Sequence, residues 1–293
     1  MKLHQLQVFV AAVEHGGIRA AARHLGSSQA ALTKALRGLE EEAGVALLTR
    51  GARGVGPTRA GEDLLVRARL VTRQVALARE ELRRAAGEGG SEGEVRAGLT
   101  PLLTLAALGP AFRRFRAAYP GVALHVIEGL VPRVLPLLRD GSLDFAVVAD
   151  GGDLPPGQFD ARHLATVGQA VVAREGHPAA RSAAALAAQE WALPAPLVPG
   201  GALDAMFDRA GVAPPTRLVV ADALSTLALL RGSDVVGIIP ERLLAEPVCA
   251  GIRAVSAAFE APSLDLRLVS RTDAPLARPA ASLARCLKDA LRP

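Results

Sequence analysis

The most constraining feature of this 293-residue chain is a run of apolar residues spaced alternately by four and three positions. Such spacing places side chains on one stripe of an α-helix, which is the seam of a coiled coil. Together with Thr58, a suitable N-terminal cap, it predicts one long helix over residues 58–86. The stripe can pack on its own domain or pair with a second copy of the chain, and we expect pairing. The pairing residues are Leu64, Ala68, Val71, Val75, Ala78 and Leu82, with Ala85 continuing the same spacing.

Charge is distributed unevenly along the chain. Residues 1–87 contain 14 lysines and arginines against 8 acidic residues, a net charge of +6, whereas residues 88–293 contain 20 against 21, a net charge of −1. A basic segment joined to a neutral one is typical of a nucleic-acid-binding module attached to a second domain. The glycine-rich stretch 87–93 has the composition of a flexible hinge.

The first 44 residues predict three short helices. Apolar residues recur at helical spacing from Leu3 to Val13 and again from Ile18 to Leu25, and Gly26-Ser27-Ser28 forms a turn. Ser28 is a suitable cap for a third helix over residues 28–42, which ends before Gly44. Its inner face consists of Leu32, Leu36 and Leu39. Two short helices joined by a tight turn form a helix-turn-helix.

The outer face of the third helix is polar, basic and nearly free of acidic residues, which suits the major groove of DNA. A glutamine can pair with adenine, a lysine or arginine with guanine or phosphate, and a small apolar group with the thymine methyl. The alternative is an ordinary solvated helix face. The basic, glycine-rich loop 50–56 then suits a wing that contacts phosphate. The predicted DNA-binding residues are Ser28, Gln29, Ala30, Thr33, Lys34, Arg37, Arg50 and Arg53.

This N-terminal region resembles the LysR-type transcriptional regulators. The matching stretches are LHQLQVFVAAVEHGG, RAAARHLGSSQAALTKALRGLEEEAGVALLTR and RGVGPTRAGEDLL. The resemblance continues through GEVRAGLT, GPAFRRFRAAYPGVALHVIEG, DGSLDFAVV and SDVVGIIPERL, and so covers essentially the whole chain. Two departures are Ala30, where the family usually has proline, and Pro57, where it usually has leucine. Proline in a first helical turn is only convenient for folding, so Ala30 should alter base contacts more than the fold.

The remaining two thirds predict an α/β domain. Short apolar runs alternate with helical stretches, which favours mostly parallel sheets. The runs are Val95–Leu99, Val122–Ile127, Phe145–Ala149, Ala170–Ala173, Leu218–Val220, Val235–Ile239 and Leu266–Val269. The resemblance implies two subdomains of periplasmic-binding-protein type, with the chain crossing between them near His163 to Leu164 and near Asp265 to Arg267.

The expected fold class is therefore α plus α/β, with an N-terminal winged helix-turn-helix, a long linker helix and a two-subdomain α/β effector domain. The expected boundaries are 1–57 for the DNA-binding domain, 58–87 for the linker and 88–293 for the effector domain. Within the last, subdomain I comprises 94–163 and 267–293, and subdomain II comprises 164–266.

Ligands of open α/β sheets lie beyond the carboxyl ends of strands, near helix N-termini. Thr100-Pro101 has this position, with a hydroxyl that is free to bind and backbone amides that favour an anion. By resemblance, an effector cleft would be lined by Thr100, Pro101, Leu130, Val131, Ala149, Gly200 and Gly201. For the glycines, simple turn chemistry is the alternative. We expect a small carboxylate with an apolar or aromatic body.

Other classes of protein fit the sequence less well. The six histidines are scattered and no catalytic motif occurs, so we expect no enzyme, metal or cofactor. A solute-binding protein without DNA binding would leave the basic N-terminal segment unexplained, and a redox sensor would need a paired-cysteine loop that Cys249 and Cys286 do not form. The expected partners are double-stranded DNA, a small-molecule effector, further copies in a homodimer or homotetramer, and RNA polymerase. We expect a cytoplasmic location and no membrane segment.

Overall fold

The computed structural model describes residues 1–51, 54–86, 93–149, 154–155, 157–178, 182–255 and 259–292. The N-terminal helices are α1 (Leu3–Glu14), α2 (Ile18–His24) and α3 (Gln29–Ala43), followed by the strands β1 (Leu48–Gly51) and β2 (Gly54–Pro57). The antiparallel hairpin of β1 and β2 is the expected wing. We call residues 1–57 the head.

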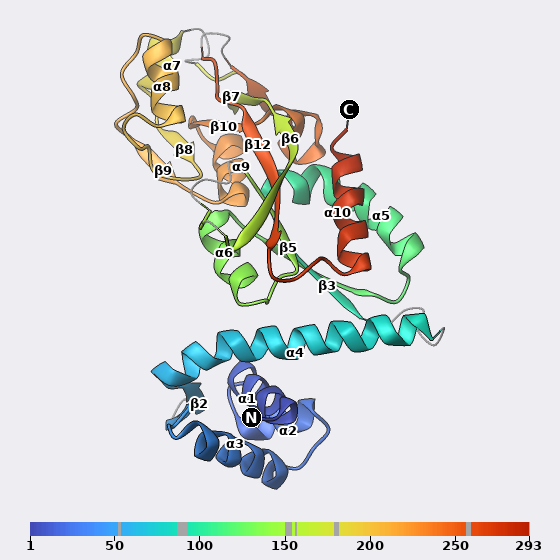
Figure 1. The fold of residues 1–293 in the computed structure, drawn as a ribbon. Coiled ribbons are helices and arrows are strands. Elements are labelled where there is room, and N and C mark those ends of the chain that lie inside the picture. Colours follow the sequence, from blue (N-terminus) through green and yellow to red (C-terminus); the bar gives the residue numbers. More distant parts are fainter. Residues whose placement is uncertain are drawn as a thin grey trace.

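The head is built around one apolar core in which α1 lies between α3 and the long helix α4 (Arg59–Ala85) (Figure 1). Phe9 of α1 is fully buried against Leu32, Leu36 and Leu39 of α3. The expected caps are present, since the Ser28 hydroxyl accepts from the Ala31 amide and the Thr58 hydroxyl accepts from the Gly61 amide. Gly44 ends α3 in the left-handed conformation that glycine adopts most readily.

The effector region contains two five-stranded sheets. The first has the order β4-β3-β5-β12-β6 and the second β11-β7-β10-β8-β9. The strands are β3 (Glu94–Leu99), β4 (Ala123–Glu128), β5 (Phe145–Ala149), β6 (Phe159–Val167), β7 (Gln169–Arg174), β8 (Trp191–Leu193), β9 (Leu218–Val220), β10 (Val236–Pro240), β11 (Ile252–Ala254) and β12 (Leu264–Arg271). The helices are α5 (Leu108–Ala118), α6 (Val131–Arg139), α7 (Ala183–Ala187), α8 (Ala202–Arg209), α9 (Ala223–Gly232) and α10 (Arg278–Ala290). Short helical segments are η1 (Leu103–Ala107), η2 (Glu241–Ala245) and η3 (Pro247–Cys249).

The expectation of mostly parallel sheets holds for only part of each sheet, since β3 is parallel to β4 and β5, and β8 is parallel to β9 and β10. In the first sheet β12 runs antiparallel to both β5 and β6, and in the second β7 runs antiparallel to β10 and β11. The reason is the connection between the two sheets, because β6 and β12 carry the chain from one to the other in opposite directions. The two predicted crossings lie side by side in these strands, where Arg267 pairs with His163.

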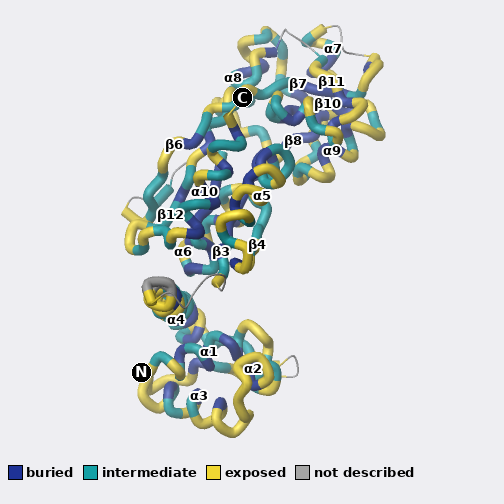
Figure 2. Tube along the Cα trace, turned by 90° about the vertical axis from the view of Figure 1, so that its right-hand side faces the viewer, coloured by how far each residue is buried: buried dark blue, intermediate teal, exposed yellow. Residues whose placement is uncertain are grey.

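One continuous core joins the two sheets. Buried residues of the first sheet, including Leu99 and Leu266, belong to the same apolar cluster as Val172 and Ile239 of the second. Figure 2 shows this buried material running through the upper part of the molecule, with α4 and the head below it. In the part of the chain that is described, no helix is both long and apolar enough to span a membrane.

Candidate DNA-binding face and effector site

The outer side of α3 is exposed along its length, on the side of the head away from α4 (Figure 1). Ser28, Gln29, Ala30, Thr33, Lys34 and Arg37 are all exposed. The cap bond to α3 is donated by the Ala31 amide, so it does not depend on the residue at position 30. This geometry agrees with Ala30 having little effect on folding.

Two of the polar side chains on this face also have partners within α3. The Thr33 hydroxyl donates to the Gln29 carbonyl at 2.8 Å. Arg37 Nε lies 2.8 Å from Glu41 Oε1 in an ion pair that is largely exposed. The face is therefore less free of acid than its sequence indicates, and Lys34 is its exposed cation without an ion pair among the described residues.

The wing is fixed to the head at both ends. The Glu40 carboxylate accepts from the backbone amides of Leu47 and Leu48, and the Val55 amide donates to the Gly16 carbonyl. Arg50 belongs to β1, where it pairs with Val55, whereas Arg53 lies outside the described residues. The sequence does not indicate this role of Glu40, because no recognisable motif links a helical glutamate to backbone amides seven and eight residues later.

The heptad stripe of α4 divides into two parts. Ala68 is fully buried, with Leu64 packed beside it, in the core of the head. Val71 and Leu82 are 45% and 71% exposed, and Ala78 is also exposed, while Val75 is half-buried. The first part of the stripe therefore packs against the chain's own head, and the second part remains available to a partner.

Thr100 lies where β3 ends, at the edge that the parallel strands β4, β3 and β5 share. Its neighbours at this edge are Gly129, Leu130 and Ala149, because Leu99 pairs with Glu128 and Val147 in the two adjoining strands. The Thr100 side chain is buried, and its hydroxyl has no hydrogen-bond partner among the described residues. The hydroxyl that the sequence indicates to be free is thus free in the structure.

The helix that follows Thr100 is irregular. Pro101 opens it, the first helical bond is donated by the Thr104 amide to the Thr100 carbonyl, and η1 is a π-helical turn closed by a bond from Leu108 to Leu103. Pro110 has no amide hydrogen to donate to the Ala106 carbonyl, which favours this wider turn. Helical turns of this kind often occur at functional sites.

The other proposed effector residues have different surroundings. Leu130 is 39% exposed as the cap of α6, and Val131 begins that helix. Gly200 and Gly201 precede α8 in the second sheet's half of the domain, and their amides are already bonded to Asp204 Oδ2 and to the Val198 carbonyl. These two glycines therefore act as turn residues and have no free amide for an anion.

Other chemistry has little support in the described residues. No group of three or more His, Cys, Asp or Glu side chains among them could hold a metal ion. Cys249 is buried and Cys286 is half-buried, and both are free thiols. Burial, with a smaller contribution from Glu246, raises the pKa of the Cys249 thiol. A raised pKa reduces the thiolate fraction and hence the reactivity expected of a redox sensor.

Family models identify both halves of the chain. Residues 3–62 match the bacterial regulatory helix-turn-helix protein model of the lysR family, and residues 88–292 match the LysR substrate binding domain. Among similar curated proteins, the regulator GalR of Pseudomonas putida is 29% identical over 98% of this chain and 73% of its own length. GbpR of Azospirillum brasilense is 30% identical over 83% and 72%, and PcaQ of Agrobacterium fabrum is 30% identical over 87% and 83%.

Solved structures show the same fold. Full-length CbnR in complex with its target DNA has a TM-score of 0.67 at 22% identity and covers 99% of this chain and 100% of its own. LysG from Corynebacterium glutamicum, with its bound effector Arg, has a TM-score of 0.67 at 22% identity and covers all of both chains. The two family models span most of the sequence with the domain order expected above, and the chain belongs to the LysR family of transcriptional regulators.

Proposed function

We propose that this LysR-type regulator places α3 in the major groove of duplex DNA and rests its wing on the adjoining phosphates. The observation that carries the proposal is the exposed face of α3, whose opposite side is fully packed in the head. Gln29, Ala30, Thr33, Lys34 and Arg37 would contact base edges or phosphate, with Ser28 at the helix start and Arg50 and Arg53 on the wing. CbnR, of the same fold, has been solved on its target DNA. RNA polymerase at the regulated promoter would be a further partner.

Lys34→Ala tests this assignment. Each phosphate contact contributes a slope of about −0.9 to the dependence of log affinity on log salt concentration. If Lys34 contacts phosphate, the variant should bind the intergenic DNA upstream of its own gene more weakly, with a slope smaller by about one. If Lys34 reads a base, the slope should stay unchanged and the preference over unrelated DNA should fall. Lys288→Ala, an exposed lysine of α10, is the charge-matched control in mobility-shift series at several salt concentrations. An unchanged series for Lys34→Ala would mean that α3 is misassigned.

We further infer that the regulator responds to a small carboxylate bound beside Thr100. The supporting observation is the buried Thr100 hydroxyl without a partner, at the start of a helix where the amides of Leu102 and Leu103 precede the first intrahelical bond. A carboxylate oxygen could accept from these donors, and Leu130, Val131 and Ala149 would contact an apolar body. Pro101 would fix the turn, while Gly200 and Gly201, whose amides are already bonded, would border the site from the second subdomain without donating to the carboxylate.

Calorimetric titration of the full chain with a panel of small aliphatic and aromatic carboxylates tests the effector. Thr100→Val keeps the shape of the side chain and removes the hydroxyl, so affinity for the carboxylate that binds should fall about tenfold. Thr72→Val is the control, because the Thr72 hydroxyl donates to the Ala68 carbonyl inside α4. Binding of cationic or sugar ligands alone would contradict the carboxylate assignment.

A further inference from the structure

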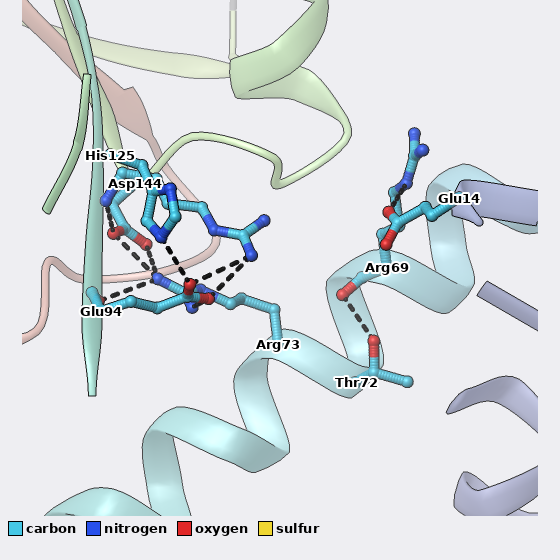
Figure 3. Close-up of polar contacts among 8 residues, drawn as sticks. Glu14, Arg69, Thr72, Arg73, Glu94, His125 and Asp144 are labelled. Carbon is cyan, nitrogen blue, oxygen red and sulfur yellow. Dashed lines mark hydrogen bonds and ion pairs between the residues drawn. The ribbon is translucent and has the colours of Figure 1, made fainter. Parts of the chain in front are cut away.

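Figure 3 shows an ionic cluster where α4 meets the effector domain. The Arg73 guanidinium donates to both oxygens of Asp144 at 3.0 Å, to the Glu94 carbonyl at 3.2 Å and to the Glu94 carboxylate. Arg73 is 13% exposed and Asp144 11%. One residue of the linker helix is therefore bound to Glu94 of β3 and to Asp144, which directly precedes β5, at a largely buried junction.

Arg69 makes a second connection one helical turn earlier. Its NH1 donates to Asp140 Oδ2 at 2.8 Å, and its Nε donates to Glu14 Oε1 of α1 at 3.0 Å. A single guanidinium thus joins the head, the linker and the effector domain. Residues four apart lie on the same face of a helix, so Arg69 and Arg73 approach the effector domain together.

The turn that contacts Arg69 and Arg73 carries two aspartates with the same spacing as the two arginines. Asp140 and Asp144 are also four residues apart, on either side of Gly141, which has a φ of +76°. A Cβ at Gly141 would lie 2.5 Å from Leu70 Cδ2, so the Leu70 side chain of α4 would have to shift, and the positive φ of Gly141 disfavours any residue with a side chain. The Asp144 carboxylate also accepts from the Arg96 amide, and the Asp140 carboxylate accepts from the Ser142 amide. Both aspartates are therefore oriented by backbone amides of the effector domain as well as by α4.

We propose that Arg69 and Arg73, with Asp140 and Asp144, are positioning residues that set the orientation of the head relative to the effector domain and transmit changes between them. We call these four residues the arginine latch. Charge-assisted hydrogen bonds from several nitrogens of one planar guanidinium group fix direction as well as distance, unlike an apolar contact that can slide. The inference rests on the proposed DNA binding and names the contacts of this chain through which that binding is communicated.

The charged groups around the arginine latch are unequal in number, and not all of their polar atoms have partners among the described residues. Three arginines, Arg69, Arg73 and Arg96, face four carboxylates, those of Glu14, Glu94, Asp140 and Asp144, and His125 lies 3.5 Å from Glu94. Arg73 Nε is buried without a partner among the described residues. Removal of either arginine would leave a partly buried carboxylate without its charge partner, so the contacts of this cluster depend on one another.

Hydrogen exchange on the full-length protein, with and without the intergenic duplex upstream of its gene, tests the proposal. In the wild type, saturating duplex should change the exchange of segments 93–99 and 140–144 at least threefold, although neither belongs to the DNA-binding face. Arg69→Met/Arg73→Met should bind the duplex with a Kd within threefold of wild type and lose this change. Arg67→Met/Arg79→Met is the matched control, because both arginines are exposed on α4 and no ion pair joins either to another described residue. It should respond like the wild type.

The remaining outcomes are also decisive. Where the wild type binds the duplex specifically, retention of the DNA-induced change in the latch variant, or absence of that change in the wild type, would overturn the latch. If wild type binds the duplex no better than unrelated DNA, the DNA proposal fails, and the latch is then judged on the free protein. There, exchange of residues 69–77 should be at least tenfold faster in the latch variant than in the control, and equal rates would refute it. Gly141→Ala leaves all four charges in place but strains the backbone at a positive φ between the two aspartates, so it should also speed the exchange of residues 69–77.

Discussion

The side-chain oxygens of residues that begin helices differ in what they bind in this molecule. Ser28, Thr58, Ser182 and Asp222 each accept a hydrogen bond from a backbone amide three residues later. In the case of Asp222 this bond lowers the pKa of the carboxyl. Thr100 has the equivalent position at the start of a helix, but its buried hydroxyl accepts and donates nothing among the described residues. The sequence indicates a helix start at Ser28, Thr58 and Thr100 alike, and the structure adds that only the Thr100 hydroxyl lacks a partner among the described residues.

Cys249 gives a prediction at the same scale. The thiolate is the reactive form of cysteine, so a raised pKa lowers the reactive fraction at a given pH, and burial limits access as well. Iodoacetamide at pH 8 should therefore label the half-buried Cys286 at least tenfold faster than Cys249 in the native protein, as measured by mass spectrometry of peptides. The two rates should converge in urea. Equal rates in the native state would restore Cys249 as a candidate redox residue.

At the scale of elements, apolar runs predicted the interior strand β5 and also the edge strands β4 and β9, but they missed the edge strands β6 and β11 and the short interior strand β8. The run Phe145–Ala149 coincides with β5, which is buried between neighbours on both sides. The strand β6 has no apolar run, because it lies at the edge of its sheet and exposes Arg162 and His163 to solvent. An apolar run in the sequence indicates a buried strand, and an edge strand such as β6 is only partly buried. The formation of β6 therefore depends on its pairing with the distant strand β12, which the local sequence does not show.

The helices follow the same rule. The spacing of Leu32, Leu36 and Leu39 predicted both α3 and its buried face, since helix period and core contact agree there. The stripe of α4 predicted the helix but not the partner of each residue, because Ala68 and Leu82 look alike in a heptad and only Ala68 meets the head. The latch was missed for a related reason. Arg69 and Arg73 show helical spacing, but their carboxylate partners are about seventy residues away in the chain.

At the scale of the whole molecule, α4 contacts the head and the effector domain and leaves an apolar stripe exposed to solvent. Its first turns pack against the head through Leu64, Leu65 and Ala68, and its middle meets the effector domain through Arg69 and Arg73. The stripe of Val71, Ala78 and Leu82 is the part left in contact with solvent in the single chain. An apolar seam on a helix this long is stabilised by a second helix of the same kind. We therefore propose that α4 forms a homodimer, which could assemble further into a tetramer and would present two copies of α3 to a two-fold-related operator.

Leu82→Glu tests this arrangement because it places a charge on the exposed part of the proposed seam, near the C-terminal end of α4. Burial of one leucine contributes about 1.5–3 kcal/mol, and each dimer contains two copies of the position, so the association constant should fall at least tenfold. Sedimentation velocity at micromolar concentration should show the variant shifting toward monomer, while Leu82→Ile, which keeps the seam apolar, should stay associated. The monomeric variant should also protect a single half-site on DNA, because one head reaches only one major groove. Wild-type sedimentation by Leu82→Glu would place the dimer contact elsewhere and leave the exposed stripe of α4 without a partner.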